Sequence, residues 1–150
     1  MISRLGIGLA LAMMLAACAP AGPPPPSTVS TSLAADAAQA QLAAALEQQG
    51  FAVEQVPGGL TAISSNPDFA KCLPVNVSDG SGDGRRVFTQ VQERRAMASV
   101  RFTPGAAGTD VSWSTRYSGR YLNRVNNTFF ERVCTGTGEL ERLLATALQS

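Results

Sequence analysis

Few residues in this chain of 150 are suited to catalysis. The sequence contains no histidine, which removes Ser-His-Asp and Cys-His catalysis and most zinc sites. Lys71 is the only lysine, and its place beside Cys72 in a polar turn favours simple solvation. Glu139 and Glu141 are two residues apart on a predicted helix, where neighbouring side chains point in different directions. We therefore expect no catalytic site and no enzyme activity.

One oxygen-rich loop has the spacing of a metal site. Asp79-x-Ser81-x-Asp83-Gly84 matches the first half of an EF-hand-like calcium loop, in which oxygens at positions 1, 3 and 5 suit a hard cation. Position 12 is Gln90 instead of the bidentate glutamate, and the flanking sequence predicts strands instead of helices. We interpret the loop as a solvated turn, and we expect no metal and no other cofactor. A calcium site at Asp79, Ser81 and Asp83 remains the alternative.

The three cysteines divide into one near the N terminus, Cys18, and an even pair, Cys72 and Cys134. In an exported domain such a pair predicts a structural disulfide. A redox-active pair normally has two residues between its cysteines, and this chain has no such pair. Closing a loop of about 62 residues predicts up to roughly 4 kcal/mol of stabilisation.

The N terminus has the parts of an export signal. Arg4 supplies a positive charge, residues 5–15 are apolar, and small residues precede Cys18. The apolar segment is shorter than the roughly 20 residues that a membrane-spanning helix needs. The sequence therefore predicts a cleaved signal peptide over residues 1–17.

Leu15-Ala16-Ala17-Cys18 resembles the lipobox of bacterial lipoproteins. The resemblance implies cleavage before Cys18, a diacylglyceryl group on its sulfur, and a fatty acid such as palmitate on the new amino terminus. Ala19 follows the cysteine, and by the same resemblance to Gram-negative lipoproteins it implies an outer-membrane address in the cell envelope. We expect the domain to face the periplasm.

The mature chain divides into a proline-rich tether, residues 18–32, and one domain, residues 33–150. The domain is large enough to bury a single core. Its charge is uneven: residues 33–84 carry one base and six acids, a balance of −5, whereas residues 85–132 carry nine arginines and three acids, a balance of +6. Because the mature side chains sum to zero, the composition argues against nucleic-acid binding.

Hydrophobic periodicity predicts an α+β domain of two layers, in which a helix at each end of the domain packs on an antiparallel sheet. Ser32 is the expected N-cap of the first helix, and Phe129, Phe130 and Val133 are expected in the core. The expected helices are residues 33–49 and 138–148, and the expected strands are 51–56, 60–65, 75–77, 87–93, 96–103 and 109–118.

Arginines occur on or near adjacent predicted strands. If Arg101 and Arg116 share the solvent face, they form with Arg94 and Arg95 a face able to bind carboxylates or phosphates. This predicts a non-catalytic binding or envelope-assembly module, whose partner is an envelope protein, peptidoglycan or lipid phosphate. The alternatives are a small envelope hydrolase and the calcium-binding domain.

The expected layout is similar to that of small Gram-negative outer-membrane lipoproteins of unassigned role. It is also loosely similar, in architecture alone, to the helix-grip domains of lipoproteins in the β-barrel assembly machinery. A shared architecture does not carry a shared function.

Overall fold

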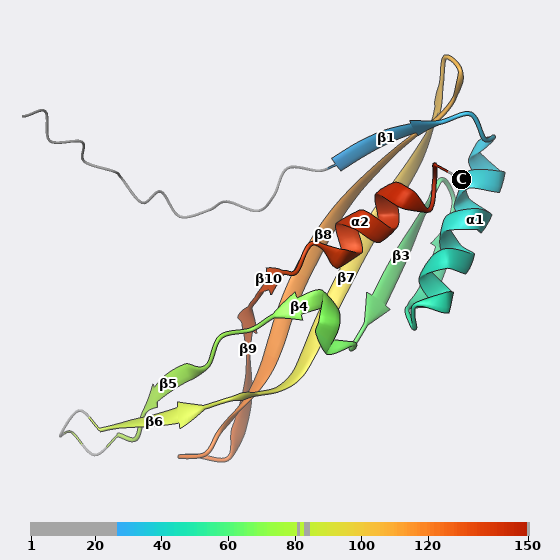
Figure 1. The fold of residues 1–150 in the computed structure, drawn as a ribbon. Coiled ribbons are helices and arrows are strands. Elements are labelled where there is room, and N and C mark those ends of the chain that lie inside the picture. The colour runs from blue at the N-terminus through green and yellow to red at the C-terminus, as the bar shows by residue number, and fades with distance from the viewer. Residues whose placement is uncertain (1–26, 81, 83–84, 150) are drawn as a thin grey trace, which may run out of the picture.

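The computed structural model describes residues 27–80, 82 and 85–149. Their elements combine two α-helices, a short 3-10 helix and antiparallel strands (Figure 1). In chain order they are β1 Ser27–Thr31, α1 Ala35–Gln48, β2 Ala52–Val56, β3 Gly59–Ser64, the 3-10 helix Pro67–Phe69, β4 Ala70–Lys71, β5 Val75–Ser78, β6 Arg86–Thr89, β7 Val91–Gly105, β8 Gly108–Asn123, β9 Thr128–Val133, β10 Thr135–Gly136 and α2 Glu139–Thr146. The expected α+β class, with an antiparallel sheet and two helices, is confirmed.

A long hairpin forms the centre of the main sheet. β7 and β8 pair from Gly105 and Gly108 at the turn to Val91 and Tyr121 at the other end. The sheet order is β1-β8-β7-β3-β2, and β9 pairs with the second half of β8. At about 3.4 Å per residue, the 16 residues of β8 extend over roughly 54 Å. This strand gives the body its elongated shape in Figure 1.

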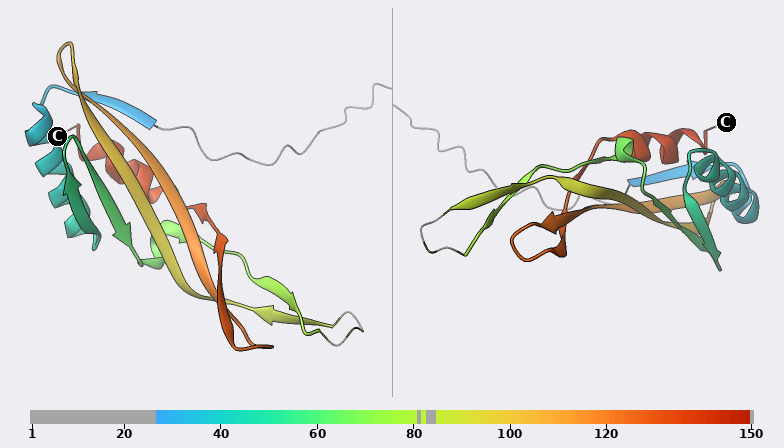
Figure 2. Two further views of the ribbon diagram at one scale, coloured as in Figure 1. Left: turned by 180° about the vertical axis from the view of Figure 1, so that it is seen from behind. Right: turned by 90° about the horizontal axis from the view of Figure 1, so that it is seen from below.

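The two faces of the sheet differ in polarity. On β7, Ala96, Ala98, Val100 and Phe102 are buried, while Ser99, Arg101 and Thr103 between them are exposed. Figure 2 shows α1 and α2 on one side of the sheet. We call the side of Ala98 and Val100 the helix-side face and the side of Ser99 and Arg101 the open face.

Both helices bury apolar side chains in the cluster that contains the helix-side residues of β7 and β8. The fully buried positions are Ala38, Leu42 and Leu46 of α1, and Leu140 and Leu144 of α2. Their spacing of three and four residues places each set on one side of its helix. None of the helices among the described residues is long and apolar enough to cross a membrane.

The helices begin differently from the sequence prediction. The N-cap of α1 is Ala34, which offers no side-chain hydrogen bond, so the expectation of a Ser32 cap is wrong. α2 begins after Gly138, whose left-handed φ of 89° turns the chain into the helix. Thr137 contributes beside it, because its hydroxyl accepts a hydrogen bond from the Glu139 amide at 3.4 Å.

Two segments at the edges of the sheet also differ from the prediction. Ser27–Thr31, assigned from the sequence to the tether, forms β1 and pairs with residues 109–113 of β8. Phe129 and Val133 are 52% and 88% exposed, so their expected place in the core is wrong. They lie on the edge strand β9 and, by its register with β8, on the open face. Phe130, on the other side of β9, is half-buried and stacks on Tyr121.

The predicted disulfide is confirmed. Cys72 and Cys134 are joined, with an S–S distance of 1.97 Å. The bond lies next to the small sheet in which β4 pairs with β10. It passes close over Gly119 of β8, where an added Cβ would lie 2.9 Å from the Cys72 sulfur and 3.0 Å from the Cys134 sulfur. Glycine is therefore needed at position 119 for the bond to pack on the strand.

Candidate binding face on the open side of the sheet

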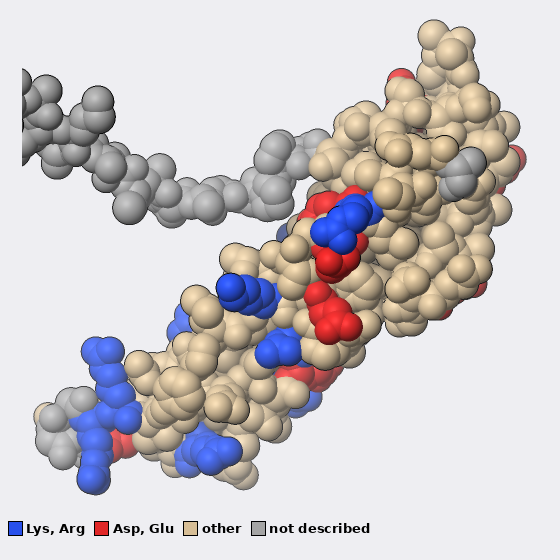
Figure 3. All heavy atoms as spheres, in the orientation of Figure 1, with Lys and Arg blue, Asp and Glu red and all other residues tan. Residues whose placement is uncertain are grey.

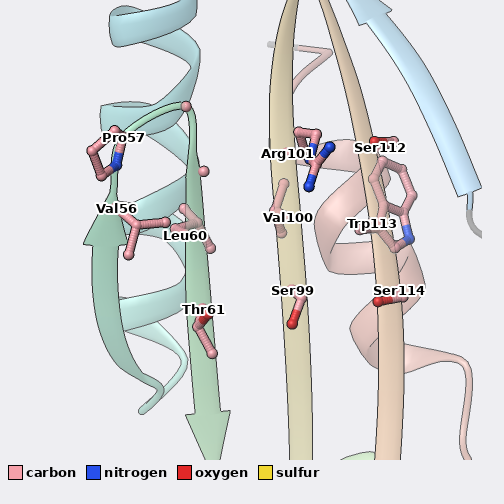
Figure 4. Close-up of a pocket in the computed structure, with 12 residues that line it drawn as sticks. Val56, Pro57, Leu60, Thr61, Ser99, Val100, Arg101, Ser112, Trp113 and Ser114 are labelled. Atoms are coloured by element: carbon pink, nitrogen blue, oxygen red, sulfur yellow. The ribbon is translucent and has the colours of Figure 1, made fainter.

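The open face contains a shallow hollow of about 370 Å³ beside Arg101 (Figure 4). Arg101 lies in register between Gly59 of β3 and Ser112 of β8. Ser99 and Ser114, one step further along β7 and β8, also line the hollow. An arginine at the centre of small hydroxyl side chains can donate several hydrogen bonds to an anionic group placed over it.

Small side chains account for the shape of this surface. At Gly59 an added Cβ would lie 2.6 Å from the carbonyl oxygen of Val100, so this position has no room for a larger residue. Ser99, Ser112 and Ser114 are the shortest hydroxyl side chains, and they leave the sheet uncovered beside the arginine. The guanidinium is consequently accessible from solvent instead of being enclosed by neighbours.

Arg116 shares the open face with Arg101, as strand alternation predicts. Arg101 is opposite Ser112, and Arg116 follows Ser112 by four residues on the same side of β8. At about 3.4 Å per residue the two positions are roughly 14 Å apart along the strand. Both side chains are exposed, and neither forms an ion pair with any acidic residue among those described.

Arg94 and Arg95 do not both belong to this face. Arg95 lies on it, and its Nη2 is 3.3 Å from Oε1 of Glu93, whose other oxygen is 3.9 Å from Arg120. Arg94 is its direct neighbour in the strand and therefore points to the helix side, where it is half-buried and its Nε has no hydrogen-bond partner. The predicted grouping of four arginines is corrected: Arg94 is not part of the open face.

A polar cluster that the sequence did not predict lies between α2 and β8. Oε1 of Glu141 accepts hydrogen bonds from the hydroxyls of Thr115, at 2.7 Å, and Tyr117, at 2.5 Å. Glu139, by contrast, pairs with Arg142 on the exposed side of α2. Thr115 was the available signal, because it is a polar residue within the apolar alternation of β8.

The Tyr117 hydroxyl should make stability depend on pH in the alkaline range. Burial and the hydrogen bond to Glu141 raise the pKa of Tyr117 above its ordinary value of 10.0. Because the folded-state pKa is the higher one, this contribution is complete below pH 10 and is lost as the pH rises further. We expect Tyr117→Phe to cost about 1–3 kcal/mol at pH 8, since Glu141 loses a donor. The difference from wild type should shrink above pH 10.

Urea unfolding of both proteins at several pH values between 8 and 12 measures this difference. Tyr121 is the control, because its hydroxyl donates to the backbone carbonyl of Leu73, at 2.6 Å, and not to a carboxylate. A free-energy difference between Tyr117→Phe and wild type that stays constant up to pH 12 would contradict the assignment.

The calcium alternative falls largely outside the described residues. Ser81 and Asp83 are not described, and the Asp79 amide donates to the carbonyl oxygen of Arg85, at 3.1 Å, next to the paired strands β5 and β6. Within residues 27–80, 82 and 85–149, no three cysteine or acidic side chains come together in a way that could hold a metal ion.

No protein-family model, curated protein sequence or solved structure matches this chain. The class that can be stated is therefore structural: an α+β domain with one exposed, arginine-bearing sheet face. Its function has to be argued from the geometry of that face.

Proposed function

We propose that this protein is a non-catalytic binding or assembly module, held at the periplasmic side of a Gram-negative outer membrane by acyl chains on Cys18. The lipobox-like segment before Cys18 supports the anchor. Several acyl chains give stable attachment, because each buried methylene adds about 0.8 kcal/mol. The tether between Cys18 and β1 then holds the domain close to the membrane.

The observation that carries the binding role is the pair Arg101 and Arg116 on the open face. Each is exposed and lacks an ion-pair partner among the described residues. A guanidinium binds a carboxylate through two parallel hydrogen bonds, and the serines beside Arg101 can add further ones. A partner with carboxylates about 14 Å apart, such as an acidic envelope protein, suits this arrangement.

The architecture also favours binding over hydrolysis. Enzyme sites usually enclose their substrate in a concave pocket, whereas the hollow beside Arg101 is shallow and open. The proposal takes α1 and α2 as a layer that covers the helix-side face, since their buried leucines belong to the same core cluster as Val100 and Trp113. Such a layer would leave the open face as the broad surface for a partner.

A pull-down from solubilised envelopes tests the binding role. The wild-type protein is compared with Arg101→Ala/Arg116→Ala at low and high salt. We expect at least tenfold less partner with the double variant, because a hydrogen bond to a charged group contributes about 1.5–3 kcal/mol. High salt should weaken binding to wild type in the same direction.

Lys71→Ala/Arg142→Ala is the matched control, since it also removes two positive charges but from β4 and α2. This control should retain the partner. Acidic protein, peptidoglycan fragments and phospholipid are measured separately in the eluate. A partner that survives both salt and the Arg101→Ala/Arg116→Ala change would show that the open face is not the site.

A further inference from the structure

We propose that one end of the body docks on the anionic phospholipid surface of the membrane that holds the lipid anchor. This distal end consists of the hairpin strands β5 and β6 and the turn 124–127 that joins β8 to β9. It lies opposite the β7–β8 turn (Figure 1). The inference rests on the anchor in the proposed function but is independent of Arg101 and Arg116.

Charge is separated along the long axis of the molecule. Residues 75–95 and 118–133 carry seven arginines and four acids, a balance of +3. The rest of the mature chain carries four bases and seven acids, a balance of −3. Figure 3 shows Lys and Arg side chains gathered toward the end that carries β5 and β6. An anionic surface therefore attracts the distal end and repels the remainder.

The distal end also exposes apolar side chains among its arginines. Phe88 of β6 is 57% exposed, Phe129 of β9 is 52% exposed, and Val125 in the turn is 43% exposed. The guanidinium of Arg120 lies 4.0 Å from the centre of the Phe129 ring. Aromatic rings and arginines with apolar stems are suited to the headgroup region, where the ring is partly buried and the charge stays solvated.

These segments are adjacent although they are distant in sequence. The hydroxyl of Thr89, at the end of β6, donates to the carbonyl oxygen of Leu122 in β8, at 3.3 Å. The views in Figures 1 and 2 agree that the β5–β6 hairpin and the β8–β9 turn lie at the same end of the body. Arg86 and Arg124 can therefore approach one membrane surface together.

The tether is long enough to allow this orientation. β1 runs antiparallel to β8, with Ser27 opposite Trp113, so β1 starts on the side that faces the distal end. The nine residues from Cys18 to Ser27 reach at most about 30 Å. The ten residues from Trp113 to Asn123 cover about 34 Å of β8. The β7–β8 turn is also within reach, so charge decides which end meets the membrane.

Hydrogen exchange of the mature protein, reconstituted in vesicles, tests the docking. The vesicles contain phosphatidylethanolamine alone or with one-quarter phosphatidylglycerol. We expect backbone amides of residues 86–89 and 124–130 to exchange at least tenfold more slowly in the anionic vesicles, since each arginine near such a surface raises affinity roughly fivefold. Amides at the β7–β8 turn, residues 105–108, should not change.

Arg86→Glu/Arg124→Glu should remove the protection, whereas Arg101→Glu/Arg116→Glu, with the same charge change on the open face, should keep it. Equal exchange in the two kinds of vesicle, or protection that moves to the open face, would overturn the proposal. Flotation of the vesicles before exchange reports on the anchor: protein that does not float with either composition lacks the anchor, which separates that failure from absent docking.

Discussion

Replacing Cys72 and Cys134 together by alanine is expected to lower the melting temperature by roughly 10 °C or more. The bond closes a loop with a sequence separation of 62 residues. In the chain-entropy model such a closure stabilises the fold by roughly 4 kcal/mol, and any strain in the native state reduces that figure. In a domain of this size each kcal/mol moves the melting temperature by several degrees.

The effect should be large because the bond joins segments that little else holds. β4 and β10 are two residues each, and they pair only through Lys71 with Thr135 and Ala70 with Gly136. Thr137 adds a hydrogen bond from its hydroxyl to the carbonyl oxygen of Asp68, at 2.7 Å. Without the disulfide, the chain leading into α2 depends on these few contacts and on the helix's own apolar side.

Thermal unfolding followed by circular dichroism measures the change. Wild-type protein treated with a reductant is the matched control and should melt at the temperature of the double variant, while the double variant should not respond to reductant. A double variant that melts within about 2 °C of oxidised wild type would contradict the stabilising role of the bond.

The regular elements could be predicted because their periodicity is local. In β7 and β8 the alternation of apolar and polar residues identifies both strands and also places Arg101 and Arg116 on one face. In α2 the leucines at three- and four-residue spacing identify the helix. The Cys72–Cys134 pair followed from counting cysteines in an exported chain.

The errors occur where position in the sheet overrides local composition. Phe129 and Val133 look like core residues, yet β9 has β8 as its only strand neighbour, so both stay exposed. Ser27–Thr31 has no apolar pattern and becomes a strand by pairing with β8, about 80 residues later in the chain. The contact of Glu141 with Tyr117 likewise depends on where α2 lies over the sheet, which α2's own periodicity does not specify.

Arg94 shows the opposite case, since the available rule was sufficient. Successive residues of a strand point to opposite faces, so Arg94 and Arg95 cannot share one surface in a regular strand. The register of β7 with β8 is regular from Glu93 onward, with the irregularity between Val91 and Glu93. Applying the alternation back from Ala96 would have assigned Arg94 to the helix side.

Cys18→Ser is expected to abolish stable attachment to the membrane and to leave the protein as an uncleaved precursor. The lipobox-like Leu15-Ala16-Ala17-Cys18 places the thiol where the acyl-bearing group would attach. A hydroxyl cannot replace the thiolate as the nucleophile for that transfer at neutral pH. Loss of two or more acyl chains removes about 0.8 kcal/mol for each methylene, far more than the distal arginines can restore.

Membrane fractionation and mass spectrometry of the intact protein measure both consequences. Cys72→Ser/Cys134→Ser is the matched control, because it removes the other two cysteines and should still carry the acyl mass and sediment with the outer membrane. Wild-type protein whose mature N terminus carries no acyl mass would refute the anchor. In that case the distal end would have to hold the domain at the membrane by charge alone, and roughly fivefold in affinity for each arginine is too little for stable attachment.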